Sequence, residues 1–173
     1  RRGPTRGLYR LYFDDDPTQP WHKRLIGGDQ HEILFMDYAR QPPNRWTYAW
    51  GTRHTGSFLK LTRRSAPIHF PVDQNTGHGK GVALGDLNND GRDDLAITSG
   101  HAEGKYGVYF YAQPAQNADR ADQWTRHDIG GRTGTKFDRI ELIDLDNDGD
   151  LALLTCEEKE NLGVIWYENP AIP

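Results

Sequence analysis

Apolar and polar residues alternate in three segments of the chain that resemble one another. These segments are HEILFMD, which ends at Asp37, KGVALGD, which ends at Asp86, and DRIELID, which ends at Asp144. Alternation with a period of two is typical of a β-strand that buries one face. The three aspartates lie about 50 to 60 residues apart, close to the period of a four-stranded repeat unit. The pattern therefore predicts three repeats of one strand arrangement.

Other strand-like runs recur at matching places around these segments. Each segment is preceded by one of the runs WHKRLIG, PIHFPV and WTRHDIG. Each is followed by a β-rich run (WTYAWGTR, DLAITSG or LALLTC) and then by a glycine-led aromatic run (GSFLKLTRR, YGVYFYAQP or GVIWYENP). Four strands per unit predict an all-β fold, a β-propeller with blades of four antiparallel strands.

The predicted blades cover residues 21–64, 67–114 and 124–170. The opening run GLYRLYF matches only the aromatic strand, so we expect residues 7–13 to be the lone last strand of a preceding blade. Propellers normally need about 4–8 blades to bury both faces of every sheet. We therefore expect residues 1–173 to be part of a larger propeller of about seven blades, or a propeller completed by self-association.

Composition narrows the classes of partner. The net charge is −4, and the basic residues are scattered among acids, which argues against a nucleic-acid partner. No run of residues has the apolar length needed to cross a bilayer, so membrane insertion is not expected. The single cysteine, Cys156, lies in the apolar run LALLTC, which favours a buried, inert thiol.

The segment DLNNDGRDDL of the middle unit has oxygen-bearing side chains at alternate positions, with a glycine at the sixth position for the sharp turn. Hard oxygen ligands in this pattern suit Ca²⁺, which accepts flexible coordination. The predicted ligands are Asp86, Asn88, Asp90, Asp94 and the main-chain carbonyl of Arg92. The segment is not an EF-hand, because Ile97 stands where that loop has a bidentate glutamate. The alternative is a turn in which these side chains only cap their own main chain.

The last unit carries a similar segment, DLDNDGDLA, whose candidate ligands are Asp144, Asp146, Asp148 and Asp150. Ala152 takes the place of the last carboxylate, so we expect this loop to bind Ca²⁺ more weakly or through a water molecule. The corresponding segment of the first unit, DYARQPPNRW, has lost the pattern, and we expect that blade to be free of metal.

The segments DLNNDGRDDL, DLDNDGDL and GVIWYENP resemble FG-GAP/VCBS repeats, the calcium-binding propeller repeats related to those of integrin α-subunits. The resemblance covers essentially the whole chain and is to bacterial secreted proteins of this type. It implies a Ca²⁺-stabilised propeller in an extracellular or periplasmic location. The functions of the family range from adhesion and glycan binding to occasional lyase or dehydratase activity.

Because strand direction alternates within a blade, the metal loops should lie on one face and the ligand on the other. The residues that this geometry gathers opposite the metal loops are His31, His78, Lys80, Lys136, Asp138, Arg139, Arg53, His54, His101, Glu103, Glu157 and Glu158. From this set we predict ligand binding by His31, His78, Lys80, His101, Glu103 and Asp138. Ordinary solvated loop residues are the alternative interpretation.

Two functions fit this arrangement. The first is a non-enzymatic binding or scaffolding module for a carbohydrate or protein ligand. The second is the catalytic propeller of a carbohydrate-active lyase or dehydratase, in which His31, His78 and His101 bind a transition metal and Glu103 or Lys80 acts as the base. The sequence shows no Ser/His/Asp motif and no paired-carboxylate motif, so the binding module is the first interpretation.

Overall fold

The computed structural model describes residues 6–41, 45–62 and 64–170 of the chain. Within these ranges thirteen β-strands and one short 3₁₀ helix, η1 (Ala121–Gln123), make up the regular structure, which confirms the all-β prediction. All the strand pairs in these sheets are antiparallel. No helix in this part of the chain is long and apolar enough to cross a membrane.

The strands form three blade-like sheets and one separate pair. The first sheet has the order β3 (Ile33–Gln41), β4 (Arg45–Thr52), β5 (Gly56–Lys60) and β6 (Ile68–Phe70). The second sheet has the order β7 (His78–Gly85), β8 (Asp94–Gly100), β9 (Val108–Ala112) and β10 (Thr125–Asp128). The third sheet consists of β11 (Phe137–Ile143), β12 (Ala152–Glu157) and β13 (Gly163–Tyr167), and β1 (Leu8–Tyr12) pairs with β2 (His22–Gly27).

The sheets are offset by one strand from the repeat units expected from the sequence. The run that begins at Pro67 closes the first sheet as β6, and the run that begins at Trp124 closes the second sheet as β10. The strand expected to be alone, β1, pairs with β2 along its length. Each of these runs pairs with the strand before it, because the chain turns back antiparallel after the third strand of the sheet. In the sequence the runs lie between two units, and nothing there indicates which unit they join.

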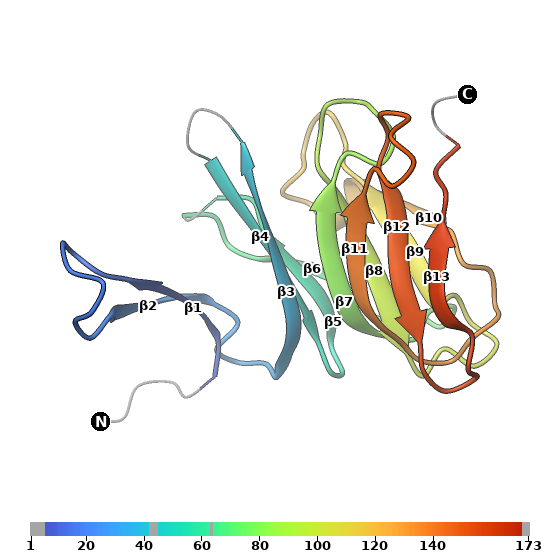
Figure 1. Cartoon of the computed structure of the whole chain (residues 1–173), viewed down its shortest axis with the longest axis horizontal. Coiled ribbons are helices and arrows are strands. Elements are labelled where there is room, and N and C mark those ends of the chain that lie inside the picture. The colour runs from blue at the N-terminus through green and yellow to red at the C-terminus, as the bar shows by residue number, and fades with distance from the viewer. Residues whose placement is uncertain (1–5, 42–44, 63, 171–173) are drawn as a thin grey trace.

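The sheets stand in an open row, like blades of a propeller that do not close into a ring (Figure 1). The inner strands β3, β7 and β11 lie side by side, with β7 in the middle. The loops that follow β7 and β11 project at the top of the view, and the loops that precede these strands lie at the bottom. The candidate metal loops and the predicted ligand residues thus lie at opposite ends of the inner strands.

Two apolar clusters hold the three sheets together. One lies between the first and second sheets and includes Leu59, Phe70 and Leu95. The other lies between the second and third sheets and includes Ala96 and Phe137. Strand β8 is buried along its whole length, and its alternate residues enter the two clusters in turn, as expected for a strand covered on both faces.

The inner strands share an irregularity near their first residues. The register of pairing shifts between Ile33 and Phe35 in β3, between Gly79 and Val82 in β7, and between Phe137 and Ile140 in β11. Such β-bulges change the direction in which side chains point and often occur beside functional sites. The shifts place Leu34, Lys80 and Asp138 at the same end of the molecule as the predicted ligand face.

Close approach of the main chains keeps neighbouring sheets in contact at this end. A Cβ atom at Gly51 of β4 would lie 2.1 Å from the carbonyl oxygen of Lys80. A Cβ atom at Gly81 of β7 would lie 2.5 Å from the carbonyl oxygen of Asp138. Because both obstacles are main-chain atoms, only glycine fits at either position without moving a sheet.

Candidate functional site

The two candidate metal loops have the same main-chain conformation. Asn89 and Asn147, at the fourth position, have φ angles of 55° and 63°, and the glycines at the sixth position have φ angles of 82° and 99°. In each loop the glycine N–H donates a hydrogen bond to the first aspartate, over 2.7 Å to Asp86 and 3.2 Å to Asp144. Left-handed asparagine and glycine curl the loop so that its side-chain oxygens converge.

In the last loop the carboxylates of Asp144, Asp146 and Asp148 come within 4.8 Å of one another. It is the one such group of three or more metal-binding side chains in the described residues. The Oδ1 atom of Asp144 is buried and has no hydrogen-bond partner among these residues. A buried, unpaired carboxylate oxygen beside two more carboxylates fits a hard divalent cation such as Ca²⁺. Asp150, the fourth predicted ligand, is only 3 % exposed.

The middle loop differs because it contains its own cation. The guanidinium of Arg92 pairs with the carboxylate of Asp90 and also donates a 3.0 Å hydrogen bond to the carbonyl of Gln113. The last loop has Asp150 at the corresponding position. The carboxylates of the last loop therefore converge more closely than those of the middle loop, although the sequence favoured the middle loop as the metal site.

Asp94 ties the middle loop to the sheet. It is fully buried, and its two oxygens accept hydrogen bonds from the N–H groups of Leu87, at 3.0 Å, and Gln113, at 2.9 Å. Burial raises the pKa of Asp94 to about 6, against the effect of these two N–H groups. Asn88 also bonds within the loop, accepting a 3.2 Å hydrogen bond from the N–H of Asp90.

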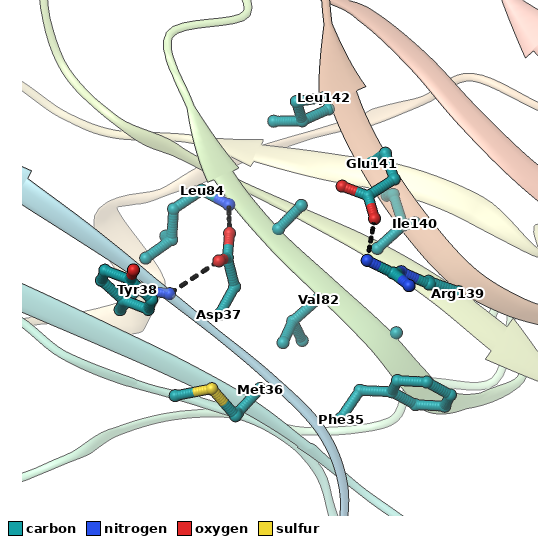
Figure 2. A pocket seen from close by; sticks show the side chains of 12 residues that line it. Phe35, Met36, Asp37, Tyr38, Val82, Leu84, Arg139, Ile140, Glu141 and Leu142 are labelled. Atoms are coloured by element: carbon teal, nitrogen blue, oxygen red, sulfur yellow. Dashed lines mark hydrogen bonds and ion pairs between the residues drawn. The ribbon is translucent and has the colours of Figure 1, made fainter. Parts of the chain in front are cut away.

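In the first sheet, Asp37 joins two blades. Its carboxylate accepts hydrogen bonds from the N–H groups of Tyr38, at 2.7 Å, and of Leu84 in β7, at 2.8 Å (Figure 2). The β3–β4 ladder continues past Asp37 as far as the pair of Gln41 with Arg45, through the positions that a metal loop takes in the other units. This aspartate occupies the first position of the repeat but holds the first sheet to the second.

The three inner strands line an open cavity of about 320 Å³. Figure 2 shows Asp37 and an ion pair between Arg139 and Glu141 on its walls, together with apolar side chains such as Val82. Both charged groups are committed to partners within the wall. A second pocket, at the other end of β7, is lined by more histidine, lysine and arginine side chains.

That second pocket lies at the opposite end of β7 from the metal loop and has a volume of about 400 Å³. Loops and strand ends of all three sheets contribute to it, and we call it the histidine pocket. Its lining consists of Leu34, Arg53, His54, His78, Gly79, Lys80, Gly100, His101, Thr135, Lys136 and Lys159.

Three imidazole rings meet in the histidine pocket. The ring centroids of His54 and His78 lie 5.6 Å apart, and those of His78 and His101 lie 5.2 Å apart. The Nδ1 atom of His78 is buried and has no hydrogen-bond partner in the described residues. Burial lowers the pKa of His78, and repulsion from His101, His54 and Lys105 lowers it further.

The six predicted ligand residues fall into three groups. His78, Lys80 and His101 line the histidine pocket. Asp138 and Glu103 reach it indirectly, through ion pairs with Lys80 and Lys159.

His31 lies elsewhere, because its ring stacks on Phe58 at 4.6 Å and its Nδ1 contacts Thr55 at 3.4 Å. The proposed metal site of His31, His78 and His101 is therefore not assembled; His54, not His31, joins the other two histidines.

One acidic side chain organises the wall of this pocket. Glu157 is 3 % exposed, and its carboxylate accepts hydrogen bonds from four N–H groups. Burial raises the pKa of Glu157, but these N–H groups outweigh burial and bring the pKa down to about 2. Two of the N–H groups belong to Lys136 and Lys159, whose side chains line the pocket.

A scan against protein-family models matches the FG-GAP repeat over residues 78–111, from β7 to β9. This segment includes the middle metal loop as well as His78 and His101. The chain contains an FG-GAP repeat. The comparisons with curated proteins and with solved structures found no match.

The segment that matches the FG-GAP repeat therefore has a candidate metal loop at one end and residues of the histidine pocket at the other. Lys159 was not among the residues predicted from the sequence. His54 and Lys136 were predicted to lie on the ligand face, but not to bind the ligand. The signal for Lys159 was weak, because a lysine in a polar loop is ordinary. It reaches the pocket only because the main chain folds around Glu157, a contact that no repeat pattern reveals.

Proposed function

We propose that this protein is a Ca²⁺-stabilised propeller module that binds a carbohydrate or protein ligand in the histidine pocket, as part of a secreted protein. The observation that carries the proposal is the meeting of three sheets at one pocket lined by histidine, lysine and arginine side chains, away from the candidate metal loops. Ligand sites are typically concave, with a few polar groups placed by a rigid scaffold.

Calcium would be held in the last loop by Asp144, Asp146 and Asp148, with Asp150 nearby, and in the middle loop by Asp86, Asn88, Asp90, the Arg92 carbonyl and Asp94. FG-GAP repeats often bind calcium, and the unpaired buried oxygen of Asp144 supports a cation at the last loop. Bound calcium would neutralise the clustered carboxylates and fix the hairpin turns. Extracellular calcium modules commonly bind the ion at about 0.1–1 mM.

Secretion is supported by the repeat type, because FG-GAP repeats are typical of extracellular proteins. The remaining blades of a larger propeller, or further copies of this chain, would cover the sheet edges that face outward in the row. Val164 of β13, 74 % exposed, lies on such an edge.

A glycan array, run with and without calcium, tests the binding role directly. We expect at least one class of ligand to bind, and we expect binding to be lost in the double variant His78→Ala/His101→Ala. The thermal stabilisation of that variant by calcium should be unchanged, since the metal loops lie at the other end of β7. If substitutions in the metal loops abolish binding while the double variant binds normally, the proposed ligand face is wrong.

A further inference from the structure

The histidine pocket differs in charge from the rest of the molecule. The chain as a whole has a net charge of −4, yet the described residues that line the pocket include four permanent cations, three histidines and no acidic side chain. The cations are Arg53, Lys80, Lys136 and Lys159. A concave surface with charges of one sign concentrates ligands of the opposite sign.

Each of the four cations has an acidic partner, but every partner lies outside the pocket lining. Arg53 pairs with Glu32 at 3.1 Å and Lys159 pairs with Glu103 at 2.6 Å, and all four side chains are more than half exposed. Exposed pairs of this kind contribute little to stability. An anionic ligand can therefore replace Glu32 and Glu103 at small cost, whereas the mostly buried pair of Lys80 with Asp138 stays intact.

The conformation of His101 is a second, independent observation. Its φ angle is 55°, in the left-handed region. In the described residues, all other non-glycine positions with positive φ are asparagines, which adopt this region most readily. The neighbouring main chain holds His101 in place, because Ala102 donates a 2.9 Å hydrogen bond to Thr135 and Gly100 bridges to Lys136. Strained conformations of this type are maintained mainly at functional sites.

The pocket also offers an unused hydrogen-bonding atom. His78 Nδ1 is buried without a partner in the described chain, and the His78 ring lies close to the rings of both His54 and His101. A buried polar atom without a partner costs free energy that a ligand can recover by bonding to it. An imidazole N–H can donate a hydrogen bond to a carboxylate, and the bond is stronger when the imidazole is protonated. The surrounding lysines add positive charge, and imidazoles that stay neutral can donate to or accept from sugar hydroxyl groups.

We propose that the histidine pocket binds an acidic glycan, with a carboxylate of a uronic acid held among His54, His78 and His101, and that binding strengthens as the pH falls. This inference rests on the proposed function and specifies its ligand. The charged or titratable groups nearest His78 are His54, His101 and Lys105, and the pocket lining adds four more cations, Arg53, Lys80, Lys136 and Lys159. The acids paired with these four cations, Glu32, Asp138, Glu158 and Glu103, lie outside the lining. Protonation of the imidazoles adds charge that an anion stabilises and that a neutral ligand does not.

The experiment is titration calorimetry of the full chain at constant calcium with three probes: hexagalacturonate, neutral maltohexaose and a hexaglutamate peptide. We expect hexagalacturonate to bind at least about tenfold more tightly at about pH 5.5 than at about pH 7.5. We expect maltohexaose and hexaglutamate to bind more weakly than hexagalacturonate at both pH values.

His101→Gly separates binding from folding. Glycine adopts a positive φ without strain, so the melting temperature should stay the same or rise, while affinity for hexagalacturonate should fall by about tenfold or more. His127→Gln is the matched control, because His127 stacks on Phe110 at 4.8 Å on the outer strand β10. The control variant should bind hexagalacturonate as tightly as the unmodified chain does. Because it is measured at the same calcium concentration, it also shows any effect of calcium that binds to the uronate groups.

The outcomes distinguish this inference from the proposed function. If maltohexaose binds as tightly as hexagalacturonate, and His101→Gly weakens both, the ligand face stands but the acidic glycan is overturned. Tighter binding of hexaglutamate would overturn the glycan in favour of an acidic protein segment. Binding of hexagalacturonate that is unchanged in His101→Gly, or that weakens on acidification, also overturns the inference. Absence of binding by all three probes, together with an unresponsive glycan array, overturns both.

Discussion

Lys80 of β7 and Asp138 of β11 form an ion pair between the second and third sheets, and each residue lies in the bulge of its own strand. Their side chains are 17 % and 14 % exposed. Burial lowers the pKa of Lys80, and repulsion from Lys136 adds to this effect, whereas attraction to Glu158 opposes it. The ion pair with Asp138 offsets part of the cost of burying the ammonium.

Removing one partner of this pair should therefore destabilise the fold more than removing both. We expect Asp138→Asn or Lys80→Met alone to lower the free energy of unfolding by about 2–4 kcal/mol, because a mostly buried group is left unpaired. The double variant Lys80→Met/Asp138→Leu should recover much of this loss. Urea unfolding of the four proteins gives the coupling energy. Single variants that each cost less than about 0.5 kcal/mol would show that the pair is no more important than an exposed one.

Calcium should stabilise the chain through the carboxylates of the last loop. At a calcium concentration of about ten times the dissociation constant, the expected gain is about 1.4 kcal/mol, or about 3–6 °C in melting temperature. The double variant Asp146→Asn/Asp148→Asn should lose a large part of this shift, measured by thermal unfolding with and without calcium. Asp15→Asn, which removes an exposed acid in the β1–β2 turn, is the control. Equal calcium responses in both variants would remove the last loop as a site.

Arg92 should oppose calcium in the middle loop, because its guanidinium pairs with the candidate ligand Asp90. Arg92→Ala should raise calcium affinity of this loop by about two- to fivefold, the value of a partly exposed ion pair. The measurement is calorimetry in the Asp146→Asn/Asp148→Asn background, where the middle loop is the remaining candidate. Arg92→Lys keeps the charge and should change the affinity less. If Arg92→Ala instead lowers the calcium affinity, the hydrogen bond from Arg92 to Gln113 would be what keeps the loop in its binding conformation.

Glu157 should make stability depend on pH in acid. Its pKa of about 2 lies below the ordinary value of 4.5, so its carboxylate stabilises the fold fully above about pH 4.5 and loses this effect as the pH falls toward about 2. Glu157→Gln should cost about 1–3 kcal/mol at neutral pH, because the N–H groups lose a charged acceptor. The difference between the two proteins, followed by urea unfolding from about pH 7 to about pH 3, should stay constant down to about pH 4.5 and shrink below it. A difference that stays constant down to about pH 3 would contradict the assignment.

Much of the fold could be predicted from the sequence because the repeated pattern is local. Alternation of apolar residues defines the strands, and aspartate, asparagine and glycine at fixed spacing define the hairpin loops. The grouping of strands into sheets could not be predicted in the same way. β6 lies in the sequence between β5 and β7, and only hydrogen bonding in three dimensions assigns it to the first sheet.

The candidate site was harder to predict because it depends on contacts between units. The sequence places His78 and His101 at the ends of strands of one blade, and both line the same pocket. It gives no indication that His31 stacks on Phe58, or that Arg92 turns toward Asp90. Side-chain direction at a loop or a bulge depends on the neighbouring sheet, and the repeat pattern contains no information about that neighbour.

The shared bulge of the inner strands has a consequence for how this scaffold can change. Lys80 and Asp138 pair across two sheets at their bulges, whereas Leu34, at the bulge of β3, belongs to neither apolar cluster. Leu34, His54 and His101 can therefore change the pocket, while Lys80, Asp138 and the apolar residues hold the sheets together. A library randomised at Leu34, His54 and His101 can search for new specificities without altering the residues that keep the blades packed, provided that Gly51 and Gly81 remain glycine.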